Sequence, residues 1–396
     1  MPYDFFYKKL DQLARREFPG LGDTSVAWDH LVSPVEIRLP KSVYAKAESA
    51  IRAFHSLSRR PQYSALLEPM PDISDTKTDY ESVLMAYDFH TNEAGECFLV
   101  EVNTNASGFL LASLMELVHS GVEARDYPPL QSLRASFTNE LRRWNANAGP
   151  ARVAITDEDI EQQKMLPEFI MYRDWFRADG WTAEFCEARD FTVRDNRLHT
   201  PAHGAVDLVY NRLTDFYLEQ PQHAALRQGF HQGLVCLTPN PREYWLLADK
   251  QRLIQLTEPD FLAKAGATEQ EIAALRKVLI PTFEKSAFPS IDDIWQQRRS
   301  LFFKPKRSHG AKSVYRGESV SRKVFERLMQ EDILIQHFTP AQKVPVDDPR
   351  SVLSNWKFDL RFYVYANQIQ LCVARIYQGQ VTNFASPLGG LTKVVF

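Results

Sequence analysis

Apolar residues recur at both helical and alternating spacings within residues 1–145. The stretch 41–57 has apolar side chains three and four positions apart, which predicts an amphipathic helix. Its apolar face consists of Val43, Ala47, Ala50, Ile51 and Phe54. Two strand-like runs, 82–90 and 96–104, flank a short turn-forming sequence and predict a β-hairpin. A second helix is expected over 108–121, where a glycine ends the apolar pattern.

Strands and helices alternate in the next segment, residues 150–240. A helical pattern over 160–180 contains Pro167, which would kink or break a helix. Strand-like runs lie around it, at 152–156, 182–188 and 205–212. This alternation predicts a small parallel sheet built from βαβ units.

The rest of the chain forms two further segments, residues 241–330 and 331–396. The first opens on a helical stretch over 244–257. The second contains a long alternating run over 358–377 that predicts a hairpin turning at Ala366-Asn367. Together the four segments predict a mixed α/β (α+β) fold.

Composition excludes several classes of protein. The 396 residues carry a net charge of -3, so we expect no nucleic-acid partner. No run approaches the length needed to span a bilayer, and the charged N-terminus lacks the apolar core of a signal peptide. The cysteines lie in apolar runs without metal-ligand spacing, so we expect buried thiols and a cytoplasmic protein. The sequence leaves the oligomeric state open, a homo-oligomer included.

Three oxygen-bearing side chains are expected to meet on the first hairpin. Glu101 and Asn103 are two residues apart and therefore point to the same face of a strand. The hairpin returns Asp88 alongside them. Oxygen ligands of this kind suit Mg²⁺, so the three are a candidate metal site. Taken without the polar loop that follows them, they are more typical of a half-exposed strand that faces solvent.

Two lysines are candidates for binding phosphate. Lys304 ends an apolar strand and precedes a loop of small residues that contains Gly310. Lys250 lies in the helical stretch 244–257. Neither lysine belongs to a phosphate-binding P-loop, because the glycine pattern of that motif is absent. Each lysine alone is also typical of an ordinary surface cation.

The apolar run 333–340 ends in a proline turn and is a candidate adenine site. Backbone groups of Gln336, His337 and Phe338 would meet the edge of the base while apolar side chains enclose its ring. A plain core strand is the alternative for this run.

Charged residues on the second hairpin suggest an anion site. Asp359 and Arg361 share one strand face, Arg375 lies on the partner strand, and Asn383 follows it. Arginine binds phosphate through two parallel hydrogen bonds and stays charged. The alternative for Asp359 and Arg361 is a surface ion pair of little energetic value.

Taken together, these motifs resemble the ATP-grasp superfamily. The resemblance assigns Asp88, Glu101 and Asn103 as metal ligands. It also implies contacts with nucleotide, phosphate or the reacting carboxyl, made by Lys250, Lys304, Gly310, Gln336, His337, Phe338, Asp359, Arg361, Arg375 and Asn383. Lys304, Arg361 and Arg375 would be the catalytic residues among them.

The order of the motifs differs from most members of that superfamily. The Glu-x-Asn strand comes first instead of last, which is the order expected of a circularly permuted ATP-grasp fold. Eukaryotic-type glutathione synthetase has the same order, and the similarity covers most of residues 80–396. Residues 1–145 would then hold the metal ligands, 150–240 a small parallel-sheet pre-ATP-grasp domain, 241–330 the nucleotide lobe with its lid loop, and 331–396 the rest of the core.

The resemblance implies an ATP- and Mg²⁺-dependent ligase that joins a small acid to an amine through an acylphosphate. A phosphotransferase of the same fold and a non-catalytic nucleotide-binding module are the alternatives. Neither a membrane partner nor a catalytic nucleophile is expected. Arg212 is a candidate for binding the substrate, because it follows a strand of the parallel sheet. Asn105 and Ser107, just past the strand with the metal ligands, are candidates as well. A structural ion pair is equally open for Arg212.

Overall fold

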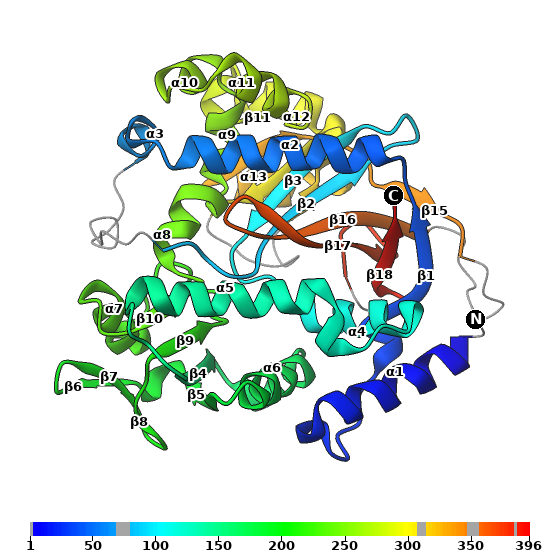
Figure 1. Cartoon of the computed structure of the whole chain (residues 1–396). Coiled ribbons are helices and arrows are strands. Elements are labelled where there is room, and N and C mark those ends of the chain that lie inside the picture. Colours follow the sequence, from blue (N-terminus) through cyan, green and yellow to red (C-terminus); the bar gives the residue numbers. More distant parts are fainter. Residues whose placement is uncertain (1–2, 69–79, 307–313, 347–355, 384–385) are drawn as a thin grey trace.

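A large mixed sheet lies at the centre of the molecule and takes strands from both ends of the chain (Figure 1). The computed structural model describes residues 3–68, 80–306, 314–346, 356–383 and 386–396. Within these residues the sheet has the order β1-β18-β17-β16-β2-β3, with β15 beside β16. Its strands are β1 (Val32–Arg38), β2 (Met85–Thr91), β3 (Cys97–Asn103), β15 (Gln342–Val344), β16 (Trp356–Tyr365), β17 (Gln368–Tyr377) and β18 (Gly390–Val395).

Both predicted hairpins are confirmed. β2 pairs with β3 and β16 pairs with β17, each pair being antiparallel, and β16 also pairs with β2. The first hairpin contains a feature that its sequence did not predict. Asp88 is opposite Glu101 but Phe89 is opposite Leu99, so Val100 is an extra, unpaired residue in a β-bulge.

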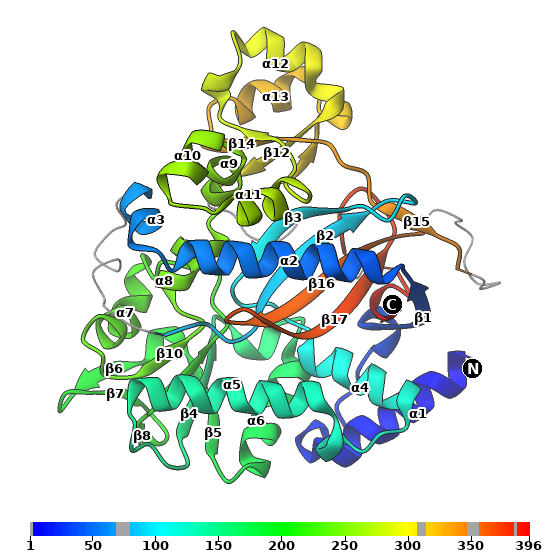
Figure 2. The same ribbon diagram turned by 45° about the horizontal axis from the view of Figure 1, so that its top comes forward.

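Helices cover both faces of the central sheet (Figures 1 and 2). Phe362 points to one face and packs on Tyr44 of α2, the helix predicted over 41–57. Tyr363 points to the other face and packs on Phe109 of α4. These N-terminal helices are α1 (Tyr3–Glu17), α2 (Lys41–Ser58), α3 (Pro61–Leu66), α4 (Phe109–Ser120) and α5 (Pro128–Trp144).

The parallel sheet predicted for residues 150–240 is present, with the order β10-β9-β4-β5. Its strands are β4 (Arg152–Asp157), β5 (Thr182–Glu187), β9 (Leu208–Asn211) and β10 (Cys236–Thr238). A separate small antiparallel sheet consists of β6 (Thr192–Arg194), β7 (Arg197–Thr200) and β8 (Gly204–Ala205). Two α-helices accompany the parallel sheet, α6 (Leu166–Ala178) and α7 (Ala224–His231). Pro167 stands in the first turn of α6, where proline is tolerated, so the predicted helical stretch breaks there.

A third sheet, of order β11-β14-β12-β13, belongs to the lobe drawn at the top of Figure 2. It consists of β11 (Thr282–Phe283), β12 (Leu301–Pro305), β13 (Tyr315–Arg316) and β14 (Ile333–His337). The chain reaches it through α8 (Pro241–Glu243), α9 (Gln251–Thr257), α10 (Pro259–Lys264) and α11 (Glu269–Arg276), and α12 (Ile291–Gln297) and α13 (Arg322–Leu328) pack in this lobe. The predicted fourth segment, 331–396, thus supplies strands to two sheets.

One predicted helix is wrong as a continuous element. A π-helical turn covers Tyr244–Ala248, Asp249 is extended, and α9 begins only at Gln251. The mixed α/β class itself is confirmed. In the described residues no helix is long and apolar enough to cross a bilayer. Cysteines 97, 186 and 236 are buried as expected, whereas Cys372 is half-buried, and all four are free thiols.

A substitution at Gly390 tests how closely β18, near the C-terminus, passes over Leu31 in the N-terminal part of the chain. It begins β18 with a φ of 126°, and a Cβ atom there would lie 2.4 Å from the carbonyl carbon and oxygen of Leu31. We expect Gly390→Ala to lower the free energy of unfolding by about 3 kcal/mol, because it adds a backbone clash to a strained φ. Urea unfolding would measure this.

Gly121→Ala is the matched control for Gly390→Ala. Gly121 also has a positive φ, 69°, but a Cβ atom there meets nothing within 4 Å. It should therefore cost only the backbone strain, about 1 kcal/mol. Equal losses in the two variants would show that β18 does not pass this closely over Leu31.

Candidate functional site

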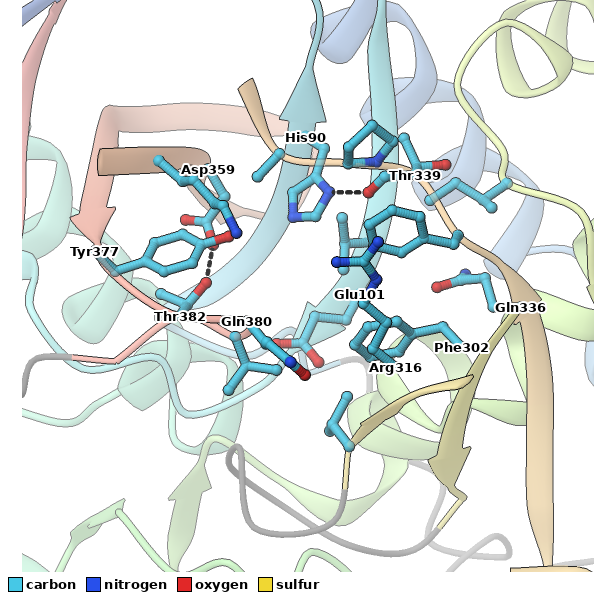
Figure 3. Close-up of a pocket in the computed structure, with 18 of the residues that line it drawn as sticks. His90, Glu101, Phe302, Arg316, Gln336, Thr339, Asp359, Tyr377, Gln380 and Thr382 are labelled. Atoms are coloured by element: carbon cyan, nitrogen blue, oxygen red, sulfur yellow. Dashed lines mark hydrogen bonds between the residues drawn. The ribbon is translucent and has the colours of Figure 1, made fainter. Parts of the chain in front are cut away.

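A cavity of about 580 Å³ lies between the central sheet and the third sheet (Figure 3). Its size is in the range of pockets that hold small molecules and cofactors. Most of the predicted site residues line it, although they come from distant parts of the chain. They are Glu101, Asn103, Lys304, Gln336, His337, Phe338, Asp359, Arg361 and Arg375.

Strand alternation explains the polar wall of this cavity. Asp359, Arg361 and Tyr363 share one face of β16, because side chains two apart point the same way. Helix α4 covers the Tyr363 end of that face through Phe109. The other end is left for the cavity, so charged residues occur there within an otherwise apolar strand.

Asp88 lies just beneath the cavity, with its side chain 1% exposed. Arg361 donates two hydrogen bonds to its carboxylate, at 2.8 and 2.7 Å, and Arg375 donates another at 2.8 Å. Burial alone would raise the pKa of Asp88, but the two guanidinium groups hold it below its ordinary value. Asp88 therefore stays ionised, with its oxygens committed to arginines.

Asp359 completes a buried group of four charges. Arg375 binds its carboxylate through two hydrogen bonds, of 2.7 and 2.9 Å, and the Thr382 hydroxyl donates a third. With Asp88 and Arg361, two carboxylates neutralise two guanidinium groups. We call these four residues the ion-pair quartet. Because it is neutral overall, it can lie in the protein interior at a tolerable electrostatic cost.

Glu101 and Asn103 face the cavity beside the quartet. The Asn103 amide nitrogen is 3.1 Å from an Asp88 oxygen and 3.4 Å from a Glu101 oxygen, so the three predicted metal ligands do converge. Mg²⁺ commonly takes one or two carboxylates together with substrate phosphates. Glu101 and Asn103, both half-buried at the cavity wall, fit that requirement. Asp88 fits it poorly, because the arginines occupy it.

Lys304 projects from β12 across the cavity towards the first hairpin. Its ammonium donates to the Val100 carbonyl at 3.1 Å and to the Gln336 side-chain oxygen at 2.9 Å. The β-bulge leaves the Val100 carbonyl available for this bond. Desolvation, with a contribution from nearby Lys250, lowers the pKa of Lys304 to about 8. The lysine is thus a buried cation that titrates close to neutral pH.

Two backbone amides of the predicted adenine segment already donate hydrogen bonds to other backbone carbonyls. The His337 amide donates to the Pro281 carbonyl at 2.9 Å, and the Phe338 amide donates to the Ser300 carbonyl at 2.8 Å. These two backbone donors are therefore not available to a base. The apolar surface is present, since the rings of Phe302 and Phe338 lie 6.3 Å apart and nearly parallel.

His90 was missed in the sequence, although it lines the cavity (Figure 3). Its ring atom Nδ1 lies 2.7 Å from the Thr339 carbonyl. Burial lowers the pKa of His90, so the ring is neutral near pH 7. His90 stands two residues after Asp88, and the alternation that paired Glu101 with Asn103 would have placed it on the same face. The cations Arg316, Lys343 and Lys357 were missed as well.

Two predicted contact residues, Lys250 and Asn383, lie outside the cavity lining. Lys250 immediately precedes α9, outside the cavity lining, although its charge reaches Lys304. The Asn383 amide donates to the carbonyls of Gln378 and Val381, at 2.8 and 2.9 Å, and braces its own loop. Gly310 lies outside the described residues.

The three substrate candidates bind one another, and none of them lines the cavity. Arg212 donates to the Asn105 carbonyl at 2.9 Å and to the Ser107 hydroxyl. The Asn105 amide donates back to the carbonyls of Arg212 and Leu213, at 3.1 and 2.7 Å. These bonds join the end of β9 to the loop that follows Asn103. Arg212 therefore has a structural role, although it acts through hydrogen bonds to a carbonyl and two hydroxyl groups and not through the ion pair expected as the alternative.

The cavity is strongly cationic. Six lysines and arginines line it within the described residues. Arg361 and Arg375 are neutralised within the quartet, so the excess positive charge comes from Lys304, Arg316, Lys343 and Lys357, against Glu101. Cations in a partly desolvated cleft attract polyanions, and phosphate groups above all. The arrangement can therefore hold a phosphorylated ligand beside a potential metal position.

The sequence matches no protein-family model, and no curated protein is significantly similar to it. Among solved structures, a glutathione synthetase-like effector from Globodera pallida, in its apo form, aligns over 100% of this chain and 97% of its own, with a TM-score of 0.57 and 10% identity. A putative γ-glutamylcysteine synthetase from Methylobacillus flagellatus KT aligns over 88% of this chain and 87% of its own, with a TM-score of 0.46 and 10% identity. At this identity the first match shows a shared fold: the chain folds like a glutathione synthetase-like protein.

Proposed function

We propose that this protein is an ATP-dependent ligase of the ATP-grasp type, with its strands in circularly permuted order. The proposal rests on the cavity between two sheets, which is lined by Glu101 from the N-terminal hairpin, by Lys304 and by an excess of cations. A nucleoside triphosphate supplies the negative charge that this cavity lacks. The full-length likeness to a glutathione synthetase-like protein supports the proposal.

The strand order supports the permutation. The hairpin that carries Glu101 comes early in the chain, yet it pairs directly with β16 near the C-terminus. The parallel pair of β1 and β18 joins the two ends of the chain in one sheet. Such an order arises when the ends of a fold are connected and the chain is opened elsewhere.

The reaction proposed is amide formation in two steps. An oxygen of the substrate carboxylate attacks the γ-phosphorus of ATP, and the bond to the β-phosphate oxygen breaks, which gives an acylphosphate and ADP. The amine then attacks the acyl carbon, inorganic phosphate leaves, and the amine gives up a proton. The acid and the amine are small, amino-acid-like or peptide molecules. Lys304 and Arg375 stabilise the negative charge on the transferring phosphoryl group.

Glu101 and Asn103 would hold magnesium, which would neutralise the negative charge of the phosphates. Asp88 would not coordinate it directly. Its role would be to fix Arg361 and Arg375 at the cavity wall, which both arginines line. This assignment distinguishes two acidic residues that the sequence placed in one ligand set.

A direct test is incubation with MgATP and panels of small acids and amines. We expect ADP to be released in step with a new amide, which mass spectrometry would detect. ADP with a phosphorylated product but no amide would identify a phosphotransferase instead. Tight MgATP binding without turnover across broad panels would identify a nucleotide-binding module.

Replacement of Glu101 tests the metal assignment. Glu101→Gln removes the charge while keeping the shape, so we expect ATP turnover to fall about a hundredfold and its Mg²⁺ requirement to shift to higher concentration. Glu93→Gln, in the exposed loop of the same hairpin, is the matched control and should leave both unchanged. A Glu101→Gln variant with the wild-type magnesium dependence would refute the assignment.

The lowered pKa of Lys304 predicts how nucleotide affinity depends on pH. The protonated lysine binds phosphate, and with a pKa of about 8 it is charged below pH 8 and increasingly neutral above it. We therefore expect the Kd for MgATP to rise about tenfold between pH 7.5 and pH 9. Isothermal titration calorimetry would measure it.

Lys304→Gln serves as the comparison in the same titration. It should bind MgATP more weakly at pH 7.5, and its Kd should stay nearly constant up to pH 9. If the variant kept the wild-type pH dependence, another group would be responsible for it.

A further inference from the structure

The tautomer of the His90 ring is fixed by its surroundings. Its Nδ1 faces the Thr339 carbonyl at 2.7 Å, and a carbonyl oxygen can only accept a hydrogen bond. Nδ1 must therefore carry the proton. In a neutral ring the other nitrogen, Nε2, is then a hydrogen-bond acceptor and cannot donate.

Nε2 has no hydrogen-bond partner among the described residues, and His90 lines the cavity. Figure 3 shows the ring between Thr339 on one side and the open cavity on the other. When a ligand displaces water from the cavity wall, this acceptor needs a donor on the ligand. His90 thus differs from Lys304 and the arginines, which are donors.

The surroundings of His90 are suited to a flat ring. Val100, Ile280 and Phe338 supply apolar surface in the same cavity. Thr339 belongs to the run 333–340 that was predicted to meet adenine, but the amides of His337 and Phe338 in that run already donate to backbone carbonyls. These two amides are therefore not available as donors to a base edge, which makes a side chain such as His90 a candidate for recognising it.

We propose that His90 determines base specificity, with Nε2 accepting a hydrogen bond from the exocyclic amino group of a 6-aminopurine. The inference rests on the proposed nucleotide site. A 6-oxopurine presents a carbonyl oxygen at the same position, so that two lone pairs would face each other. Because the Thr339 carbonyl prevents the ring from exchanging donor and acceptor, His90 cannot adapt to the oxo base. Sites that hydrogen-bond a polar group discriminate strongly against a ligand lacking it.

The test compares MgATP, MgITP and the magnesium complex of purine riboside triphosphate, which has no substituent at position 6. Calorimetry on the wild-type protein should give a Kd for ITP at least about tenfold above that for ATP, the cost of an unsatisfied buried acceptor. Purine riboside triphosphate should fall between them, since it lacks the donor but brings no opposing lone pair.

Two variants assign the preference to His90. His90→Phe keeps a ring but removes both nitrogens, so ATP and ITP should bind within about threefold of each other. His90→Gln supplies an amide that can rotate to donate or accept, and it should also lose most of the preference. His231→Phe, on helix α7 away from the cavity, is the matched control and should retain the wild-type ratio.

The outcomes separate the two proposals. If the wild-type protein bound none of the three triphosphates, the nucleotide site itself would be rejected. If it bound ATP and ITP equally, or if both His90 variants kept the preference, the nucleotide site would stand and the role of His90 would be overturned. Thermal unfolding of each variant shows whether it is folded. If His90→Phe does not fold, the comparison of ATP with ITP is made with His90→Gln alone.

Discussion

The ion-pair quartet is the interaction on which the rest of the site depends. Asp88 comes from the N-terminal hairpin, whereas Arg361, Arg375 and Asp359 come from the C-terminal hairpin, and all four are nearly inaccessible to solvent. Removing one member would leave a buried net charge uncompensated, which typically costs about 3–5 kcal/mol. The two hairpins are thereby locked in register, and the wall that faces the cavity follows from that register.

Much of this wall could be predicted, because alternation along a strand depends only on local geometry. It placed Glu101 with Asn103 and Asp359 with Arg361 before any fold was known. The β-bulge at Val100 could not be predicted, since it is a property of the pairing between two strands. Nor could the engagement of Asp88, because which carboxylate meets an arginine depends on contacts between residues more than 250 positions apart.

The substrate candidates show a different limit of sequence reasoning. A ligand is expected beyond the carboxyl ends of strands in an open parallel sheet, and Arg212 stands there after β9. The position is instead filled by the protein's own loop, through Asn105 and Ser107. A buried guanidinium needs acceptors, and a backbone carbonyl meets that need as well as a substrate would. The sequence thus placed Arg212 correctly at a polar site after β9, but the chemistry of an arginine could not show whether a substrate or the protein's own loop would bind it.

The remaining charge of the cavity connects stability with function. The quartet cancels its own charges, so the uncompensated cations are those outside it, with Lys304 the most deeply buried. Holding an ammonium in this position costs free energy in the empty protein, as its lowered pKa records. A bound polyanion would return that free energy, so part of the binding strength is stored in the empty site as electrostatic strain. The buried charge of Lys304 therefore costs free energy in the empty cavity and at the same time favours a phosphorylated ligand there.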